Sequence, residues 1–261
     1  MAAKYAIAAG GNYTADTKWS TTSGGANDTT KPTAADDVFL DAASGNVTID
    51  AAALGRSLNC TGYTGTLTHN ASVTLTLGDA TAGASNIALK LVSGMTYTAS
   101  DNLTSQISFI STSATVQEVD FAGKSTSNVT FNASSNGSWQ YTGTHNHKAS
   151  TTTTTLTKGS LDTNGQTCNW GKLDYNNANA KSLTLGASNI TLTGTSSSAW
   201  SGTSSNMTLS AGSSTITLTG ATSTFSPGTS QTFGNVIHQG SGQGQINVSF
   251  TCVNFTRTGT A

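Results

Sequence analysis

Glu118 and Asp120 form the acidic pair that comes closest to the arrangement a glycoside hydrolase needs. They lie two residues apart in the alternating segment QEVDF, residues 117–121. In a strand, Val119 and Phe121 would point inward and the two acids outward on one face, about 7 Å apart from the rise per residue. Glycoside hydrolysis uses two carboxyl groups roughly 5–10 Å apart. The alternative interpretation is a solvated strand face whose acids keep the protein soluble.

Two further groups of side chains could bind a metal ion. Asp36, Asp37 and Asp41 form the densest acidic group, and carboxylates are ligands for hard cations, although their spacing matches no known Ca²⁺ loop. The alternative is hydrogen bonding of these acids to free backbone N–H groups in turns and caps. His145 and His147 would project both rings to one side of a strand, but they lie mid-chain in a polar segment. We therefore predict no metal site and no cofactor.

Aromatic side chains could form a platform for a sugar, because rings stack on the apolar faces of carbohydrates. Trp139 and Tyr141 are two residues apart and share a face, so they are the first candidates for glycan contact. The alternative is packing inside the core or at a subunit contact. The same two interpretations apply to three more aromatic residues, Trp170, Tyr175 and Trp200.

Charged residues are scarce, at 9% of the chain, and the formal net charge is −1. Such a chain has no basic field with which to hold nucleic acid, so we expect no nucleic-acid partner. The apolar run at residues 5–9 is far shorter than the ~20 residues of a membrane span. It is also too short for an ordinary signal peptide, so we expect no membrane association and no Sec export. Neither arginine, Arg56 or Arg257, has an acid-rich cluster nearby in sequence, which argues against a polysaccharide lyase site.

Short strands are the secondary structure that the sequence predicts throughout. Apolar and polar residues alternate at residues 73–77 and 216–218, with the period of a strand that buries one face. No stretch of a dozen residues has helical periodicity, so we predict almost no α-helix beyond one turn near the N-terminus. The three cysteines lie in such alternating stretches without metal-ligand spacing, and we expect buried free thiols at Cys60, Cys168 and Cys252.

The alternating segments also recur along the chain. Residues 182–194 resemble residues 207–220: Ile190 and Ile216 align at an offset of 26 residues, whereas alignment of the first halves gives an offset of 24. A period of this size is typical of stacked architectures. One unit cannot bury its own apolar face, but stacked units pair every strand with equivalents above and below.

We therefore predict an all-β chain folded as a single right-handed parallel β-helix of about ten coils. At about 4.8 Å per coil, the body would be roughly 50 Å long. Residues 1–35 are expected to cap the N-terminal end and residues 36–261 to form the solenoid. A β-sandwich or jelly roll is the alternative fold.

Several segments resemble β-helical proteins of tailed bacteriophages and of bacterial adhesins. The first group is WS at 19–20, GG at 24–25, PTAADDV at 32–38 and SGNVTID at 44–50. The second group, which is similar to repeats of phage structural proteins and especially those of marine phages, is LTKGSLDTNGQT at 156–167, LTLG at 183–186 and ITLTG at 216–220.

The resemblance implies a non-enzymatic component of a virion exterior, either a capsid decoration or a fibre-type protein. It implies assembly in the host cytoplasm without a signal peptide, other capsid or tail proteins as partners, and a homo-oligomer that is a trimer by family analogy. Two alternatives stay open. One is a receptor-binding adhesin that recognises host surface polysaccharide, and the other is a tailspike-like enzyme that degrades glycans.

Overall fold

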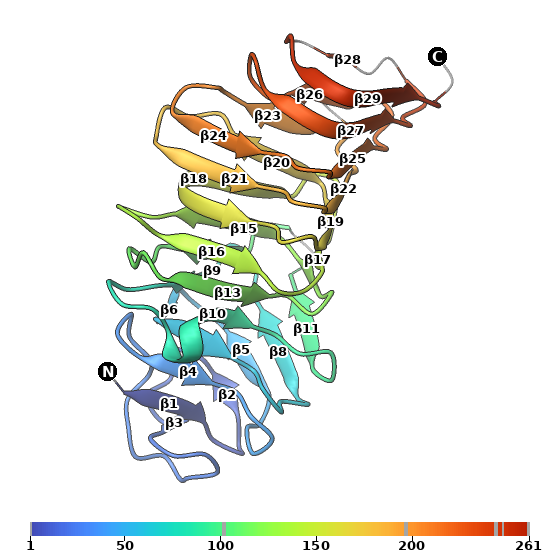
Figure 1. Ribbon diagram of the computed structural model, residues 1–261. Helices are drawn as coiled ribbons and strands as arrows, with labels where there is room; N and C mark the ends of the chain where they lie inside the picture. Colours follow the sequence, from blue (N-terminus) through green and yellow to red (C-terminus); the bar gives the residue numbers. More distant parts are fainter. Residues whose placement is uncertain (1, 101–102, 196–197, 243–244, 247, 260–261) are drawn as a thin grey trace.

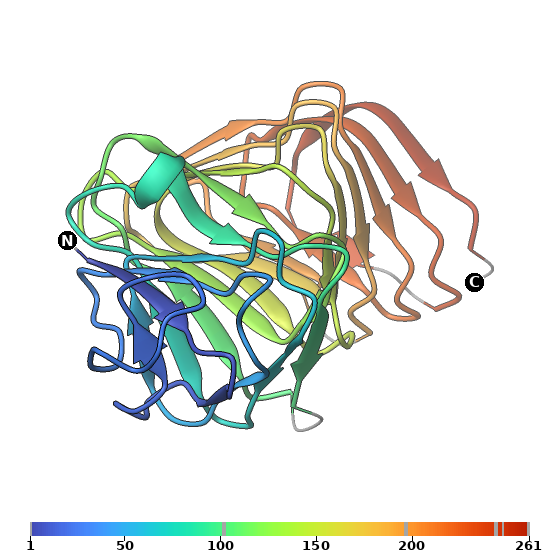
Figure 2. The same ribbon diagram turned by 90° about the horizontal axis from the view of Figure 1, so that it is seen from below.

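The chain folds as a parallel β-solenoid of about ten turns, which confirms the predicted fold class. The structure is a computed structural model in which the strands stack along one axis (Figure 1). Viewed at 90°, successive coils recede from the N-terminal end to the C-terminal end (Figure 2). The structure describes residues 2–100, 103–195, 198–242, 245–246 and 248–259.

The strands line up in three walls, which we call A, B and C. Wall A contains β1 (Ala3–Ala6), β4 (Asp37–Phe39), β7 (Ser57–Asn59), β10 (Ile87–Lys90), β13 (Val116–Asp120), β16 (Ser138–Tyr141), the end of β18 (Thr153–Asp162), β21 (Lys181–Thr184) and β24 (Met207–Ser210). Wall C contains β6 (Ala53–Gly55), β9 (Thr74–Leu77), β12 (Gln106–Phe109), β15 (Asn128–Asn132), the start of β18, β20 (Lys172–Tyr175), β23 (Trp200–Gly202), β26 (Thr224–Ser226) and β28 (Gln245–Ile246).

Wall B consists of two ladders along the remaining side. The first ladder contains β2 (Gly11–Asn12), β5 (Val47–Ile49), β8 (Thr66–His69) and β11 (Thr96–Ala99). The second contains β14 (Ser125–Thr126), β17 (His145–His147), β19 (Thr167–Trp170), β22 (Asn189–Leu192), β25 (Thr215–Leu218), β27 (Thr232–His238) and β29 (Thr251–Arg257).

The register of neighbouring coils confirms one half of the predicted repeat and corrects the other. Ile190 pairs with Ile216, as the sequence indicated. Leu183, however, pairs with Leu209, so this half of the repeat also has an offset of 26 residues and not 24. Met207 lies opposite Lys181 instead. Register follows the alternation of inward and outward positions along whole strands. The alignment of Leu183 with Met207 rested on one pair of similar side chains, which is a weaker signal than this alternation.

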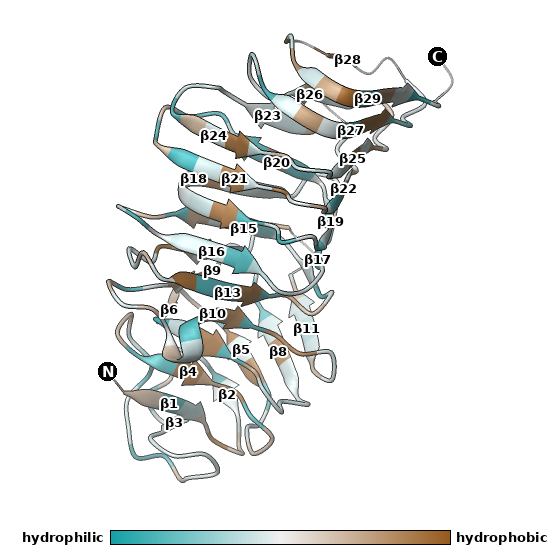
Figure 3. Cartoon of the chain, viewed as in Figure 1, coloured by the Kyte–Doolittle hydropathy of each residue, from teal (hydrophilic) through white to brown (hydrophobic). Residues whose placement is uncertain are grey.

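The core runs along the solenoid axis between the three walls. Apolar and polar colours alternate along the strands, as in β21 and β24 (Figure 3), because successive side chains of a strand point to opposite faces. Aromatic rings of neighbouring coils stack inside, for example Phe109 on Phe131 with ring centroids 4.9 Å apart. The inward positions therefore join into one continuous core rather than separate patches.

The two ends of the described solenoid differ. At the N-terminal end, β3 (Trp19–Ser20) pairs antiparallel with β1, and the indole of Trp19, which is completely buried, donates to the carbonyl of Tyr13 at 2.9 Å. β1 itself pairs parallel with β4, so the wall A ladder begins within residues 1–35. At the other end, β29 leaves Val253 77% exposed and Phe255 47% exposed.

Helical structure is limited to one short turn in the described part of the chain. This turn is the 3-10 helix η1 (Ala84–Asn86). The prediction of almost no α-helix is confirmed, and the described residues near the N-terminus do not form the one helical turn that was expected there. No helix in the described ranges has the length and apolar character needed to cross a bilayer. The thiols are free as predicted, with Cys60 and Cys168 buried and Cys252 half-buried.

Candidate functional site

Asp37 forms a buried ion pair with Arg56, which the sequence analysis missed. Asp37 begins β4 and Arg56 precedes β7 in the next coil, so stacking brings them together. Arg56 Nε donates to Asp37 Oδ1 at 2.9 Å, and Nη2 donates to Oδ2. Asp37 Oδ1 also accepts the Ser57 hydroxyl at 2.6 Å and the Ala84 backbone N–H at 3.1 Å. The sequence showed no acid-rich cluster near Arg56, and it gave no sign that the stacking of coils would bring Asp37 to this arginine.

The environment of this pair favours its charged form. Desolvation raises the pKa of the Asp37 carboxyl, but hydrogen bonds from Arg56, Ser57 and Ala84 outweigh that effect and hold the pKa below its ordinary value. The Arg56 and Asp37 side chains are only 6% and 8% exposed. The pair therefore links two coils, and it is too deeply buried for a large substrate to reach it.

The other two acids of the group also serve local structure. Asp36 Oδ2 accepts the backbone N–H of Thr33 at 2.9 Å and its hydroxyl at 2.7 Å. Asp41 Oδ1 accepts the backbone N–H of Ala43 at 3.0 Å. The alternative interpretation of turn and cap hydrogen bonds is confirmed, and no group of three or more potential metal ligands occurs among the described residues.

Glu118 and Asp120 lie on the outer face of wall A, as alternation predicted. Val119 and Phe121 between and beside them are completely buried, whereas Glu118 is exposed and Asp120 is half-buried. Asp120 Oδ1 accepts the Ala122 backbone N–H at 2.7 Å. The two carboxylates therefore lie on one open strand surface. One oxygen of Asp120 is already used there, because it accepts a hydrogen bond from the turn that follows the strand.

Trp139 and Tyr141 do not form a surface platform, so the prediction that they contact a glycan is wrong. They are 1% and 0% exposed, because β16 points Ser138 and Gln140 outward and both rings inward. The core-packing alternative is confirmed for these two residues. It is also confirmed for the remaining candidates, Trp170, Tyr175 and Trp200.

His145 occupies the core beside these rings. The Trp170 indole N–H donates to His145 Nδ1 at 2.9 Å, so Nδ1 is an acceptor. The neutral ring then carries its proton on Nε2, which lies 2.9 Å from the Thr126 hydroxyl. Burial, and secondarily the neighbouring His147, lower the pKa of His145 well below its ordinary value. His145 is thus a neutral hydrogen-bonding residue of the core.

His147 is held in a similar way one position beyond Asn146. Its Nδ1 lies 2.9 Å from the Gly171 backbone nitrogen and 3.1 Å from the Thr152 carbonyl oxygen. Its Nε2 lies 3.0 Å from the Thr154 hydroxyl. Desolvation lowers the pKa of His147 to about 3. Every ring nitrogen of the histidine pair has a protein partner, which leaves none directed at an external metal ion.

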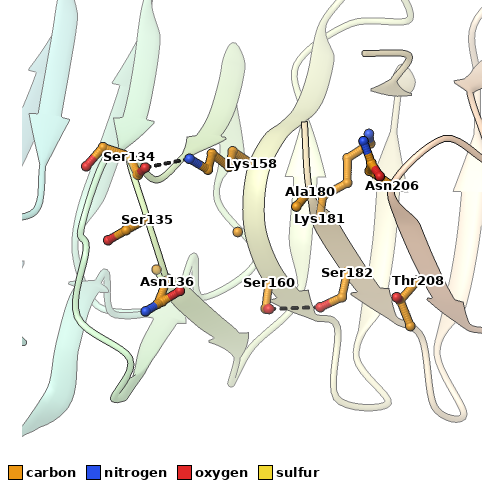
Figure 4. Close-up of a pocket in the computed structure, with 12 residues that line it drawn as sticks. Ser134, Ser135, Asn136, Lys158, Ser160, Ala180, Lys181, Ser182, Asn206 and Thr208 are labelled. Atoms are coloured by element: carbon orange, nitrogen blue, oxygen red, sulfur yellow. Dashed lines mark hydrogen bonds between the residues drawn. The ribbon is translucent and has the colours of Figure 1, made fainter. Parts of the chain in front are cut away.

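A polar groove lies at the corner between walls C and A, and its lysine, serine, threonine and asparagine side chains could bind a polar ligand. The sequence did not indicate this groove. It has a volume of about 500 Å³ and extends over four consecutive coils. In the close-up, Ser134, Lys158, Lys181 and Asn206 form one row, and Asn136, Ser160, Ser182 and Thr208 form the other (Figure 4).

The groove arises because successive coils turn this corner differently. β18 passes through the corner as one continuous strand, whereas residues 133–137 and 176–180 form loops in the coils on either side. Gly159, at φ +103°, allows the sharp bend, and a Cβ there would lie 2.7 Å from the Gly137 carbonyl oxygen. Because β18 turns tightly at Gly159 while the coils on either side turn through longer loops, the surface between those two loops is recessed.

Both lysines of the groove are anchored by backbone carbonyl groups. Lys158 Nζ donates to the Ser134 carbonyl at 2.5 Å. Lys181 Nζ donates to the carbonyls of Asn177 at 2.6 Å and Asn179 at 3.0 Å, and desolvation lowers the pKa of this ammonium. The positive charges are therefore held in fixed places at the rim and wall of the groove. No sequence signal could have identified them, because neither lysine has a charged neighbour in the chain.

The chain matches no protein-family model, no curated protein sequence and no solved structure.

Proposed function

We propose that this protein is a non-enzymatic structural component of a bacteriophage virion exterior, a capsid-decoration or fibre-type module. One observation carries the non-enzymatic part of the proposal. The ionisable pairs of the interior, namely Asp37 with Arg56 and His145 with His147, are bonded to one another or to backbone, hydroxyl and indole groups of adjacent coils. They stabilise the stack instead of facing a substrate.

The architecture suits a mechanical role. Nearly every backbone ladder links one coil to the next in register, and the core is continuous along the axis. A rod of about ten coils would extend roughly 50 Å at about 4.8 Å per coil. The phage origin rests on the sequence resemblance alone, as do the proposals of capsid or tail partners and of a homotrimer.

Cryo-electron microscopy of the phage particle whose genome encodes this chain tests the proposal. We expect rod-shaped density of about this length on the particle exterior, repeated over the capsid lattice for a decoration protein or confined to the tail for a fibre-type protein. Mass spectrometry of the same purified particles provides the control for copy number. Absence of the protein from intact particles would overturn the proposal.

A further inference from the structure

We propose that the corner groove lined by Lys158 and Lys181 binds an acidic polysaccharide through the carboxylates of its sugar units. This role goes beyond the structural one, because it gives one side of the rod a specific ligand. The proposal depends on the shape of the groove, the sign of its charge and the repeat of its hydroxyl groups.

The groove has the size and form of an oligosaccharide site. Its volume of about 500 Å³ falls within the roughly 300–1,000 Å³ that is typical of small-molecule sites. It runs along the solenoid axis over four coils, so a chain-like ligand can lie in it lengthwise (Figure 4). A long, open groove favours a polymer over a compact metabolite.

The charge of the lining selects for an anion. The twelve lining residues include two lysines and no acid, although the chain as a whole has a net charge of −1. An ammonium group carries three N–H donors, and the Ser134 carbonyl takes one of those of Lys158, so Lys158 is the lysine that can contact a carboxylate directly. Lys181 is buried and donates to Asn177 and Asn179, so it contributes its positive charge to the groove. The closest acid along β18 is Asp162, which accepts hydrogen bonds from Gln140 at 3.0 Å and from the Asn164 backbone at 2.7 Å.

The hydroxyl groups of the groove repeat once per coil. Ser160, Ser182 and Thr208 pair in register on the outer face of wall A, and Ser182 Oγ donates to Ser160 Oγ at 2.8 Å. The coil spacing of about 4.8 Å is close to the length of one pyranose unit in an extended chain. Successive sugars can therefore meet successive hydroxyl groups.

Amide groups at the two ends of the hollow complete a sugar-like lining. Asn136 and Asn206 flank the hydroxyl ladder, and amides both donate to and accept from sugar hydroxyl groups. The lining contains no aromatic ring on which a nucleic-acid base could stack. Hydroxyl, amide and ammonium groups at repeating positions match a carboxylated sugar polymer better than a single-stranded nucleic acid, which relies on base stacking.

Isothermal titration calorimetry with a hexamer of galacturonate tests the proposal on the full chain. We expect saturable binding that weakens as the salt concentration rises. Lys158→Ala should weaken binding about tenfold, because a hydrogen bond to a charged group contributes about 1.5–3 kcal/mol, and Lys158→Arg should restore most of it. Ser182→Trp should abolish binding by filling the groove, since this outward position does not enter the core.

Matched controls separate this site from general charge attraction. Lys172→Ala removes the same charge from the outer face of wall C and should leave binding unchanged, and melting curves should show that each variant is folded. Equal weakening by Lys158→Ala and Lys172→Ala would overturn the proposal, as would no binding at all. Equal affinity for a neutral maltohexaose would overturn the acidic selectivity, and equal affinity for inorganic phosphate would show a simple anion site instead.

Discussion

The ion pair of Asp37 and Arg56 and the histidine pair of the middle coils are two ways of placing ionisable groups inside one narrow solenoid. Asp37 and Arg56 stay charged, because each supplies the counter-charge of the other across one coil step. His145 and His147 stay neutral, because desolvation lowers the pKa of both and their rings hydrogen-bond to neutral groups such as the Thr126 and Thr154 hydroxyls.

The difference shows which chemistry the interior allows. A buried charge is costly unless it is paired and hydrogen-bonded, and the counter-charge of Asp37 comes from the next coil. Where stacking supplies such a partner, as for Arg56, the charge is kept. Where stacking supplies only hydroxyl and indole partners, as for His145, the ring stays neutral and hydrogen-bonds to both of them.

Breaking the ion pair should produce the largest change in stability. Arg56→Ala leaves the Asp37 carboxylate buried without its counter-charge, and we expect a loss of about 3–5 kcal/mol in the free energy of unfolding. Urea denaturation followed by circular dichroism measures it. Arg257→Ala, at an exposed position of β29, is the control and should cost less than about 0.5 kcal/mol. A loss below about 1 kcal/mol for Arg56→Ala would mean that the pair does not hold the two coils together.

The sequence was sufficient to predict strands, stacking and the outward placement of Glu118. Alternation carried these predictions, because it depends only on the period of the strand. The same alternation places Trp139 and Tyr141 between the outward residues Ser138 and Gln140. The glycan prediction failed because the chemistry of the rings was given more weight than their position in the pattern.

Contacts between coils could not be predicted, since the number of residues per coil varies. The step from Asp37 to Ser57 is 20 residues, whereas the step from Gly11 to Val47 is 36 residues. Without the loop lengths, the sequence does not tell which residue lies above which. The ion pair of Asp37 with Arg56 and the groove both depend on this vertical alignment, so both were found only in the structure.

Acid should destabilise the fold in a pH range where the ion pair is still intact. In the unfolded chain a histidine takes up its proton near pH 6.5, whereas folded His147 does so only near pH 3 and folded His69 near pH 4. Below pH 6.5 the unfolded state therefore binds more protons, and the free energy of unfolding falls by about 1.4 kcal/mol per pH unit for each such histidine. Asp37, whose pKa is lowered on folding, adds to the loss only below about pH 4.

Urea denaturation at pH 7, 6 and 5 checks this slope. His147→Gln keeps a hydrogen-bonding side chain but removes one titrating group, so it should reduce the slope near pH 5 by about 1.4 kcal/mol per pH unit, whatever it does to stability at pH 7. An unchanged slope in this variant would show that the His147 ring is protonated in the folded protein.

The smallest effects should come from the exposed acids of wall A, which contrast with the buried acid at position 37. Glu118→Gln and Asp120→Asn should each change the free energy of unfolding by less than about 0.5 kcal/mol, because Glu118 is exposed and Asn keeps an oxygen that can accept the Ala122 N–H. Asp37→Asn is the matched substitution and should cost several times more, since it removes the carboxylate that forms the buried ion pair with Arg56. Reducing-end assays on host polysaccharide extend the test to function. The structural proposal expects no cleavage by the unaltered protein, whereas cleavage that either wall A substitution abolishes would establish the glycan-degrading alternative.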